Sequence, residues 1–186
     1  SPYTSSGQSR GASGGLGGTN PTFTPKSPQD FFGKDVDVSK LPAGMRNNNP
    51  GNIKFDSNVK WAGLVGPSKN TDQGDPQAVF NSPEAGMRAA AKLALNKYNK
   101  GAKTLNDLIS GPGGWTPGHT SAAANIAKSM GIKPSDDLKL DNQENHRKFL
   151  RGLISQEHGP AGGKYTDDII KGGVDSLYKK DKSNTG

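Results

Sequence analysis

In the second half of the chain, apolar residues recur at helical spacing in segments separated by glycine or proline. The clearest stripe follows Ser82, a good N-cap with Pro83 at the first helical position, and continues to Tyr98 before Gly101. Four more helices are expected over 104–109, 120–131, 141–157 and 166–178. Thr104, Asp141 and Thr166 are the predicted caps of three of them, and Thr120 or Ser121 is expected to start the helix over 120–131. The pattern predicts a mainly helical domain.

Ahead of Ser82 the pattern is typical of short strands. The turn-rich run Arg46-Asn47-Asn48-Asn49-Pro50-Gly51-Asn52 precedes a strand-like stretch through Ile53 and Phe55. A loop with Trp61 and Gly66 then leads to a second short strand at 77–80. Strands and helices together predict an α+β, mainly helical fold with a small β-hairpin or sheet.

Residues 1–43 differ from the rest because Gly, Ser, Thr and Pro dominate them. Such a segment cannot bury enough apolar surface to offset its ordering entropy. We therefore expect an extended Gly/Ser/Pro-rich arm over 1–43, a domain over 44–180 and a C-terminal tail over 181–186. Phe23, Phe31 and Phe32 are the expected anchors of the arm, either on this domain or on a partner chain.

Composition narrows the possible partners. The net charge of +7 suits a polyanion, which could be nucleic acid, an anionic membrane or the bacterial wall. No helix-turn-helix or aromatic RNA-binding pattern accompanies the charge, so we expect no nucleic-acid partner. No apolar run approaches the ~20 residues of a membrane span. The first residues lack the regions of a signal peptide, so export is expected to need a holin, a syringe or a virion.

Metal and cofactor chemistry is not indicated either. The chain has no cysteine, which excludes disulfides and thiolate metal sites. Its three histidines, His119, His146 and His158, have no paired metal-ligand spacing. We expect neither a metal ion nor a cofactor.

Three fragments in combination resemble a family of phage and prophage virion structural proteins with a lysozyme-like, wall-degrading domain. They are Arg46-Asn47-Asn48-Asn49-Pro50-Gly51-Asn52-Ile53-Lys54, Trp61-Ala62-Gly63 and Phe80-Asn81-Ser82-Pro83-Glu84-Ala85-Gly86-Met87-Arg88-Ala89. The resemblance spans roughly 45–178. It implies a lysozyme-like fold, peptidoglycan as the ligand and a place in the virion.

One segment departs from the family pattern. Relatives tend to follow the mid-chain tryptophan with an acidic-Asn segment and an aromatic residue. Here the sequence reads Trp115-Thr116-Pro117-Gly118-His119-Thr120, without the acid. If catalysis requires that carboxylate, this chain is inactive.

Glycosidic cleavage needs a proton donor at the leaving oxygen, and hydrolysis usually adds a second carboxylate. Of the three glutamates, Glu84 and Glu144 lie in first turns of predicted helices, where the dipole stabilises the anion. Glu157 closes a helix, where the dipole disfavours a negative charge and so suits a proton donor. Glu157 is therefore the leading candidate, with Glu84 in reserve. Glu157 follows the sheet, so the usual lysozyme-like order would have to be permuted; the alternative is a surface glutamate.

Other polar and aromatic residues are candidates for the glycan site. Asp56 is the leading second carboxylate because it follows the predicted strand, the alternative being a turn aspartate. Amides suit sugar hydroxyls and N-acetyl groups, although asparagine also favours left-handed turns. Indoles stack on sugar rings but are as often core residues. The predicted substrate-binding residues are Arg46, Asn48, Asn49, Asn52, Trp61 and Trp115.

These observations favour a virion-associated muramidase or lytic transglycosylase, located in the tail or an internal injection apparatus. It would act in the host cell envelope during genome delivery, and its arm would bind other virion proteins. The alternative is a non-catalytic structural protein of the tail or injection apparatus that retains the fold. A third hypothesis, an endolysin, fits the long arm less well, because an arm suits tethering.

Overall fold

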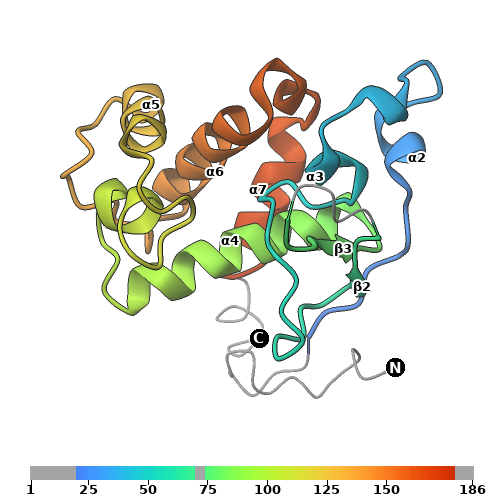
Figure 1. Cartoon of the computed structure of the whole chain (residues 1–186), viewed down its shortest axis with the longest axis horizontal. Coiled ribbons are helices and arrows are strands. Elements are labelled where there is room, and N and C mark those ends of the chain that lie inside the picture. Colours follow the sequence, from blue (N-terminus) through green and yellow to red (C-terminus); the bar gives the residue numbers. More distant parts are fainter. Residues whose placement is uncertain (1–19, 70–73, 179–186) are drawn as a thin grey trace. The chain divides into compact units, whose positions relative to one another are not determined.

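The computed structural model describes residues 20–69 and 74–178. Across these residues the protein is mainly helical with a small two-stranded antiparallel sheet, which confirms the predicted α+β class. The chain divides into two compact units, with the boundary between Ala89 and Ala90 inside helix α4 (Pro83–Asn99). The sheet, α2 and α3 belong to the first unit, and α5, α6 and α7 belong to the second (Figure 1). Most of the glycine-rich stretch and the predicted tail lie outside the described residues.

The first unit begins with a segment that lies along its surface. The Lys26 amide donates to Asn81 O at 2.8 Å, and Asn81 Nδ2 donates to Phe23 O at 3.2 Å. Ser27 then caps α2 (Pro28–Phe32) by accepting a hydrogen bond from the Asp30 amide. A short turn of 3-10 helix, η1 (Val38–Lys40), and helix α3 (Ala43–Arg46) follow. Residues 20–43 of the predicted arm therefore contain local structure. The backbone at Phe23 and Lys26 forms hydrogen bonds with Asn81 in the same unit.

The sheet of the first unit pairs β2 (Leu64–Pro67) with β3 (Ala78–Phe80). Leu64 lies opposite Phe80 and Pro67 opposite Ala78, with an irregularity in the register between Leu64 and Gly66. The predicted strand at 77–80 is confirmed by β3. Its partner is a segment that the sequence presented as a loop, because Gly66 and Pro67 are residues that usually interrupt strands.

The predicted strand through Ile53 and Phe55 is wrong. This stretch forms an isolated bridge between Lys54 and Gln77. Asn52 before it adopts a left-handed conformation with φ of 52°, and Asp56 after it begins a turn. The two turns leave too few extended residues for a strand.

Helix α4 starts as the sequence predicts. Ser82 Oγ accepts a hydrogen bond from the Ala85 amide at 3.1 Å, and Pro83 is the first helical residue. One turn later, a Cβ atom on Gly86 would lie 1.8 Å from Asn48 O. The start of α4 therefore packs directly against the backbone of the asparagine-rich turn, a contact that only glycine permits.

The second unit contains the other expected helices. They are η2 (Asn106–Ser110), α5 (Thr120–Met130), α6 (Gln143–His158) and α7 (Asp167–Asp175), with η3 (Gly159–Lys164) between the last two. Thr104 and Thr166 accept hydrogen bonds from the first turns of η2 and α7 as predicted. The predicted cap Asp141 is wrong, because Asn142 is the residue whose side chain accepts from the Asn145 amide.

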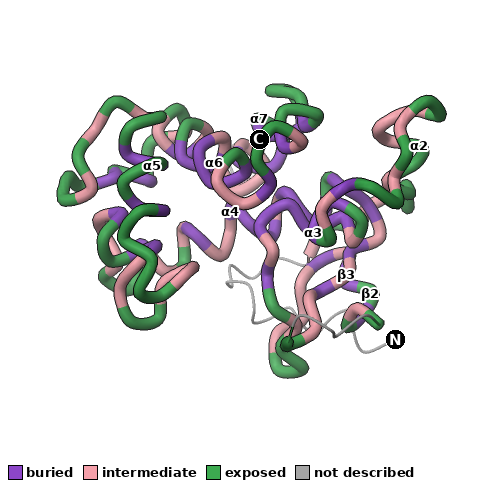
Figure 2. The backbone as a smooth tube through the Cα atoms, turned by 45° about the horizontal axis from the view of Figure 1, so that its top comes forward, coloured by how far each residue is buried: buried purple, intermediate pink, exposed green. Residues whose placement is uncertain are grey.

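Helix α6 is the centre of the second unit. It contacts α5, η3 and α7, and much of its length is buried in Figure 2. Phe149, Leu150 and Ile154 are fully buried on it, as the predicted apolar stripe requires. The core also encloses two imidazoles of α6, those of His146, which has no exposed surface, and His158.

Candidate functional site

A groove of about 970 Å³ opens over the sheet of the first unit. We call it the sheet groove. It combines side chains from α3, the asparagine-rich turn, β2 and β3. The residues that line it are Ala43, Arg46, Asn47, Asn52, Lys54, Val65, Pro67, Ser68, Lys69, Gly74, Asp75, Gln77 and Val79.

Strand alternation explains which sheet residues reach the groove. Leu64 and Gly66 on β2 are buried, whereas Val65 and Pro67 between and after them are exposed. On β3, Ala78 and Phe80 are buried, and Val79 lines the groove. One face of this small sheet therefore packs into the core, and the other supplies the apolar floor of the groove.

Three amides form a hydrogen-bonded chain along the groove. Asn47 Nδ2 donates to Gln77 Oε1 at 3.0 Å, and Gln77 Nε2 donates to Asn52 Oδ1 at 3.1 Å. Each amide holds its neighbour in one orientation and retains further donor or acceptor capacity. The groove thus presents preoriented polar groups above an apolar floor, which is the usual composition of a small-molecule or sugar site.

Arg46 and Asn52, two of the predicted substrate-binding residues, line the sheet groove. Lys54, Val65, Ser68, Lys69 and Gln77 were not singled out from the sequence. Alternation in 77–80 was the available signal for Gln77, because a strand that buries Ala78 and Phe80 turns the intervening positions to the other face.

The side chains of Asn48 and Asn49 hold the asparagine-rich turn in place through hydrogen bonds to the main chain. Asn49 is fully buried, and its Nδ2 donates to Ile53 O and Ala78 O, each at 2.8 Å. Asn48 has φ of 55°, and its Nδ2 donates to Phe80 O at 3.2 Å. Neither side chain lines the groove. Their amides hold the turn against β3 and so fix the position of the groove wall.

The three predicted catalytic carboxylates lie on separate segments, Asp56 and Glu84 in the first unit and Glu157 in the second. Asp56 is exposed, and its Oδ1 accepts a hydrogen bond from the Asn58 amide at 2.9 Å, which makes it a turn aspartate. Glu84 is exposed in the first turn of α4. Glu157 is half-buried in the last turn of α6, next to the buried His158. None of the three is among the groove-lining residues.

Both tryptophans are half-buried. The Trp115 ring packs edge-on against the core residue Phe149, with ring centroids 6.4 Å apart. Its backbone N–H donates to Leu108 O at 2.8 Å, so the loop is fixed to the second unit. Trp61 lies in the first unit, and its carbonyl accepts from the Leu64 amide at the start of β2. Neither residue lines the sheet groove.

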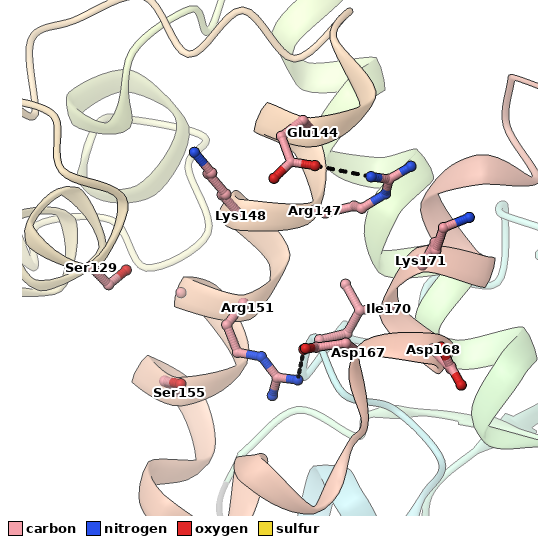
Figure 3. A pocket seen from close by; sticks show the side chains of 11 residues that line it. Ser129, Glu144, Arg147, Lys148, Arg151, Ser155, Asp167, Asp168, Ile170 and Lys171 are labelled. Carbon is pink, nitrogen blue, oxygen red and sulfur yellow. Dashed lines mark hydrogen bonds and ion pairs between the residues drawn. The ribbon is translucent and has the colours of Figure 1, made fainter.

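A second hollow, of about 430 Å³, lies in the second unit beside α6 and α7 (Figure 3). Its charged side chains are largely paired with each other. Arg151 Nη2 lies 2.8 Å from Asp167 Oδ1, and Arg147 bonds to Glu144 at 3.0 Å and to Asp175 on α7 at 3.0 Å. These pairs hold α7 on α6, and we interpret the hollow as part of that helix contact.

Within residues 20–69 and 74–178, no three His, Asp or Glu side chains form a cluster suited to a metal ion. In the same part of the chain no helix combines the length and the apolar character needed to cross a membrane.

The chain is similar in sequence to a phage protein. It is 28% identical over 145 residues to protein P5 of Pseudoalteromonas phage PM2, covering 74% of this chain and 83% of P5. No model of a known protein family matches the sequence. The similarity supports a bacteriophage context for this chain.

Proposed function

We propose that this chain is a phage virion-associated protein that binds peptidoglycan in the sheet groove and cleaves it during genome delivery. The observation that carries the proposal is the chain of amides from Asn47 through Gln77 to Asn52 above an apolar floor. The similarity to a phage protein supplies the biological context. The asparagine-rich turn resembles a segment of virion proteins with lysozyme-like domains, and this resemblance implies peptidoglycan as the ligand.

The chemistry of the groove suits a glycan strand. Sugar hydroxyls and N-acetyl groups both donate and accept hydrogen bonds, as the carboxamides of Asn47, Asn52 and Gln77 do. The C–H faces of the sugars and the acetyl methyl groups need apolar contacts, which Val65 and Val79 offer. Because the three amides already orient each other, binding costs little side-chain entropy.

For cleavage we propose Glu157 as the proton donor on its local setting in the second unit alone, independently of the sheet groove in the first unit. Glu157 lies in the last turn of α6, where unpaired carbonyl groups disfavour a negative charge, and it is half-buried. A second carboxylate has less support, because Asp56 is exposed and bonded within its own turn. A lytic transglycosylase can use a single acid, since a hydroxyl of the sugar itself attacks. The geometry therefore favours transglycosylase over muramidase.

The alternative function is a non-catalytic structural protein of the tail or injection apparatus that keeps the groove for glycan binding. The dispersed positions of Asp56 and Glu84 favour it, as does the absence of an acid after Trp115. In either function the residues before 20 are proposed to attach the protein to other virion components.

Digestion of purified peptidoglycan, with mass spectrometry of the soluble products, tests the function. Anhydro-muramyl ends identify a transglycosylase, reducing ends identify a muramidase, and binding without products identifies the structural alternative. Gln77→Ala removes the centre of the amide chain and should weaken binding about tenfold. Asn58→Ala, exposed in the same unit but outside the groove, is the matched control. Equal binding by both variants would contradict the assignment of the groove.

A further inference from the structure

Among the described residues that line the sheet groove, positive side chains outnumber negative ones. The lining includes three cationic side chains, Arg46, Lys54 and Lys69, and one described carboxylate, Asp75. Asp75 is already engaged, because Lys54 Nζ lies 3.6 Å from its Oδ2. Within residues 20–69 and 74–178, no carboxylate forms an ion pair with Arg46 or Lys69. Two cations of the groove therefore remain available to a ligand.

The Arg46 side chain is fixed by a hydrogen bond to a neutral carbonyl group and not by a carboxylate. Its Nη1 donates to Leu41 O at 2.9 Å, and the residue as a whole is exposed. A carbonyl acceptor fixes the guanidinium plane but leaves the positive charge uncompensated, and the other N–H groups can still donate. A fixed guanidinium of this kind suits a carboxylate, which it can bind through two parallel hydrogen bonds.

The floor beside these cations is apolar. Val65 is 55% exposed and is the one large hydrophobic side chain that is exposed among the described residues. Pro67 on the same strand is also exposed, and both line the groove. A ligand that suits this surface carries small alkyl groups close to carboxylates.

We propose that the sheet groove recognises the peptide-bearing sugar of peptidoglycan through its carboxylates, and so discriminates peptidoglycan from neutral glycans such as chitin. This inference rests on the proposed function. Muramic acid carries a lactyl group and a short peptide whose alanine methyls and carboxylates match Val65 and the two cations Arg46 and Lys69. The amide chain binds features that both glycans share, and the cations bind what only peptidoglycan has.

The test compares three probes by calorimetry on the full chain: a disaccharide–tetrapeptide muropeptide, the same muropeptide with its carboxyl groups amidated, and chitotetraose. The carboxylate-bearing muropeptide should bind about tenfold more tightly than either probe without carboxylates, and the advantage should shrink with added salt. Equal affinity for all three probes would overturn the inference and leave the proposed function intact. Failure of every probe to bind would overturn both.

Variants of the two cations locate the effect. Arg46→Gln and Lys69→Gln should each lower the affinity for the charged muropeptide several-fold more than the affinity for chitotetraose, and so lose most of the preference. Lys34→Gln removes an exposed charge from the same unit outside the groove and should change neither affinity. Two results would refute carboxylate recognition here: equal losses for all three probes in both groove variants, or an equal loss in Lys34→Gln.

Discussion

His146 should make the stability of the protein strongly dependent on pH. Its ring is fully buried and has polar partners on α4 and at Tyr178. Nε2 lies 3.0 Å from Ala91 O, which can only accept, so this nitrogen carries the proton. Nδ1 lies 3.2 Å from the Tyr178 hydroxyl, which itself donates to Leu140 O at 2.6 Å. The single hydroxyl hydrogen of Tyr178 goes to Leu140 O, so Nδ1 receives no donor from it, and burial is what favours the neutral ring.

Burial is the main cause that lowers the pKa of His146, from 6.5 to about 4, and the hydrogen bond to Ala91 O opposes it in part. As pH falls, the unfolded chain binds this proton first. The contribution of the neutral His146 ring to the unfolding free energy is therefore fully present above pH 6.5. It is lost between pH 6.5 and 4 and changes no further below pH 4. A shift of this size corresponds to about 3 kcal/mol.

Chemical denaturation of the wild type and of His146→Gln, at several pH values from 7 to 4, isolates this contribution. The variant lacks the titrating ring, so its unfolding free energy should not show this loss. The difference between wild type and variant should therefore shift by about 3 kcal/mol in favour of the variant as the pH falls from 7 to 4. His119→Gln removes an exposed imidazole and should follow the wild type. An NMR titration of His146 with a midpoint near 6.5, or a difference that stays constant with pH, would refute the reasoning.

Other variants test the packing and the chemistry. Gly86→Ala places a methyl group into Asn48 O and should cost about 2 kcal/mol or more in thermal unfolding, whereas Gly172→Ala, in open space on α7, should stabilise by about 0.5–1 kcal/mol. Equal melting temperatures for the two glycine variants would show that α4 does not depend on this contact. Glu157→Gln should reduce peptidoglycan cleavage by about 10²–10⁴-fold with the fold intact, and Glu84→Gln should not. The reverse result would move the acid to Glu84.

The helices were predictable because their signals are local. Ser82 and Thr166 cap helices within one turn of themselves, and the stripe on α6 needs only a period of 3.6 residues. The error at Asp141 is of one residue, since Asn142 beside it can make the same bond. Strand β2 was not predictable, because Gly66 and Pro67 conceal a strand that only pairing with β3 stabilises.

The candidate site was predictable only in part, for the same reason. Arg46 and Asn52 stand in a run whose composition suggested binding, and both line the groove. Lys69 and Gln77 reach it because β2 and β3 pair in one register, which is information held in the fold. Sequence composition could not separate the buried Asn49 from its neighbour Asn47, since the same amide chemistry serves a turn and a ligand.

The asparagine-rich turn has a consequence for comparing phage proteins. The side-chain amides of Asn48 and Asn49 donate to main-chain carbonyls, and Gly86 packs against the backbone of the same turn. The run of asparagines is thus a signature of architecture, and a chain that had lost its chemistry would still need it in order to fold. If the proposed roles hold, sorting such chains into active and inactive members starts from Glu157 on α6 and the charges in the groove.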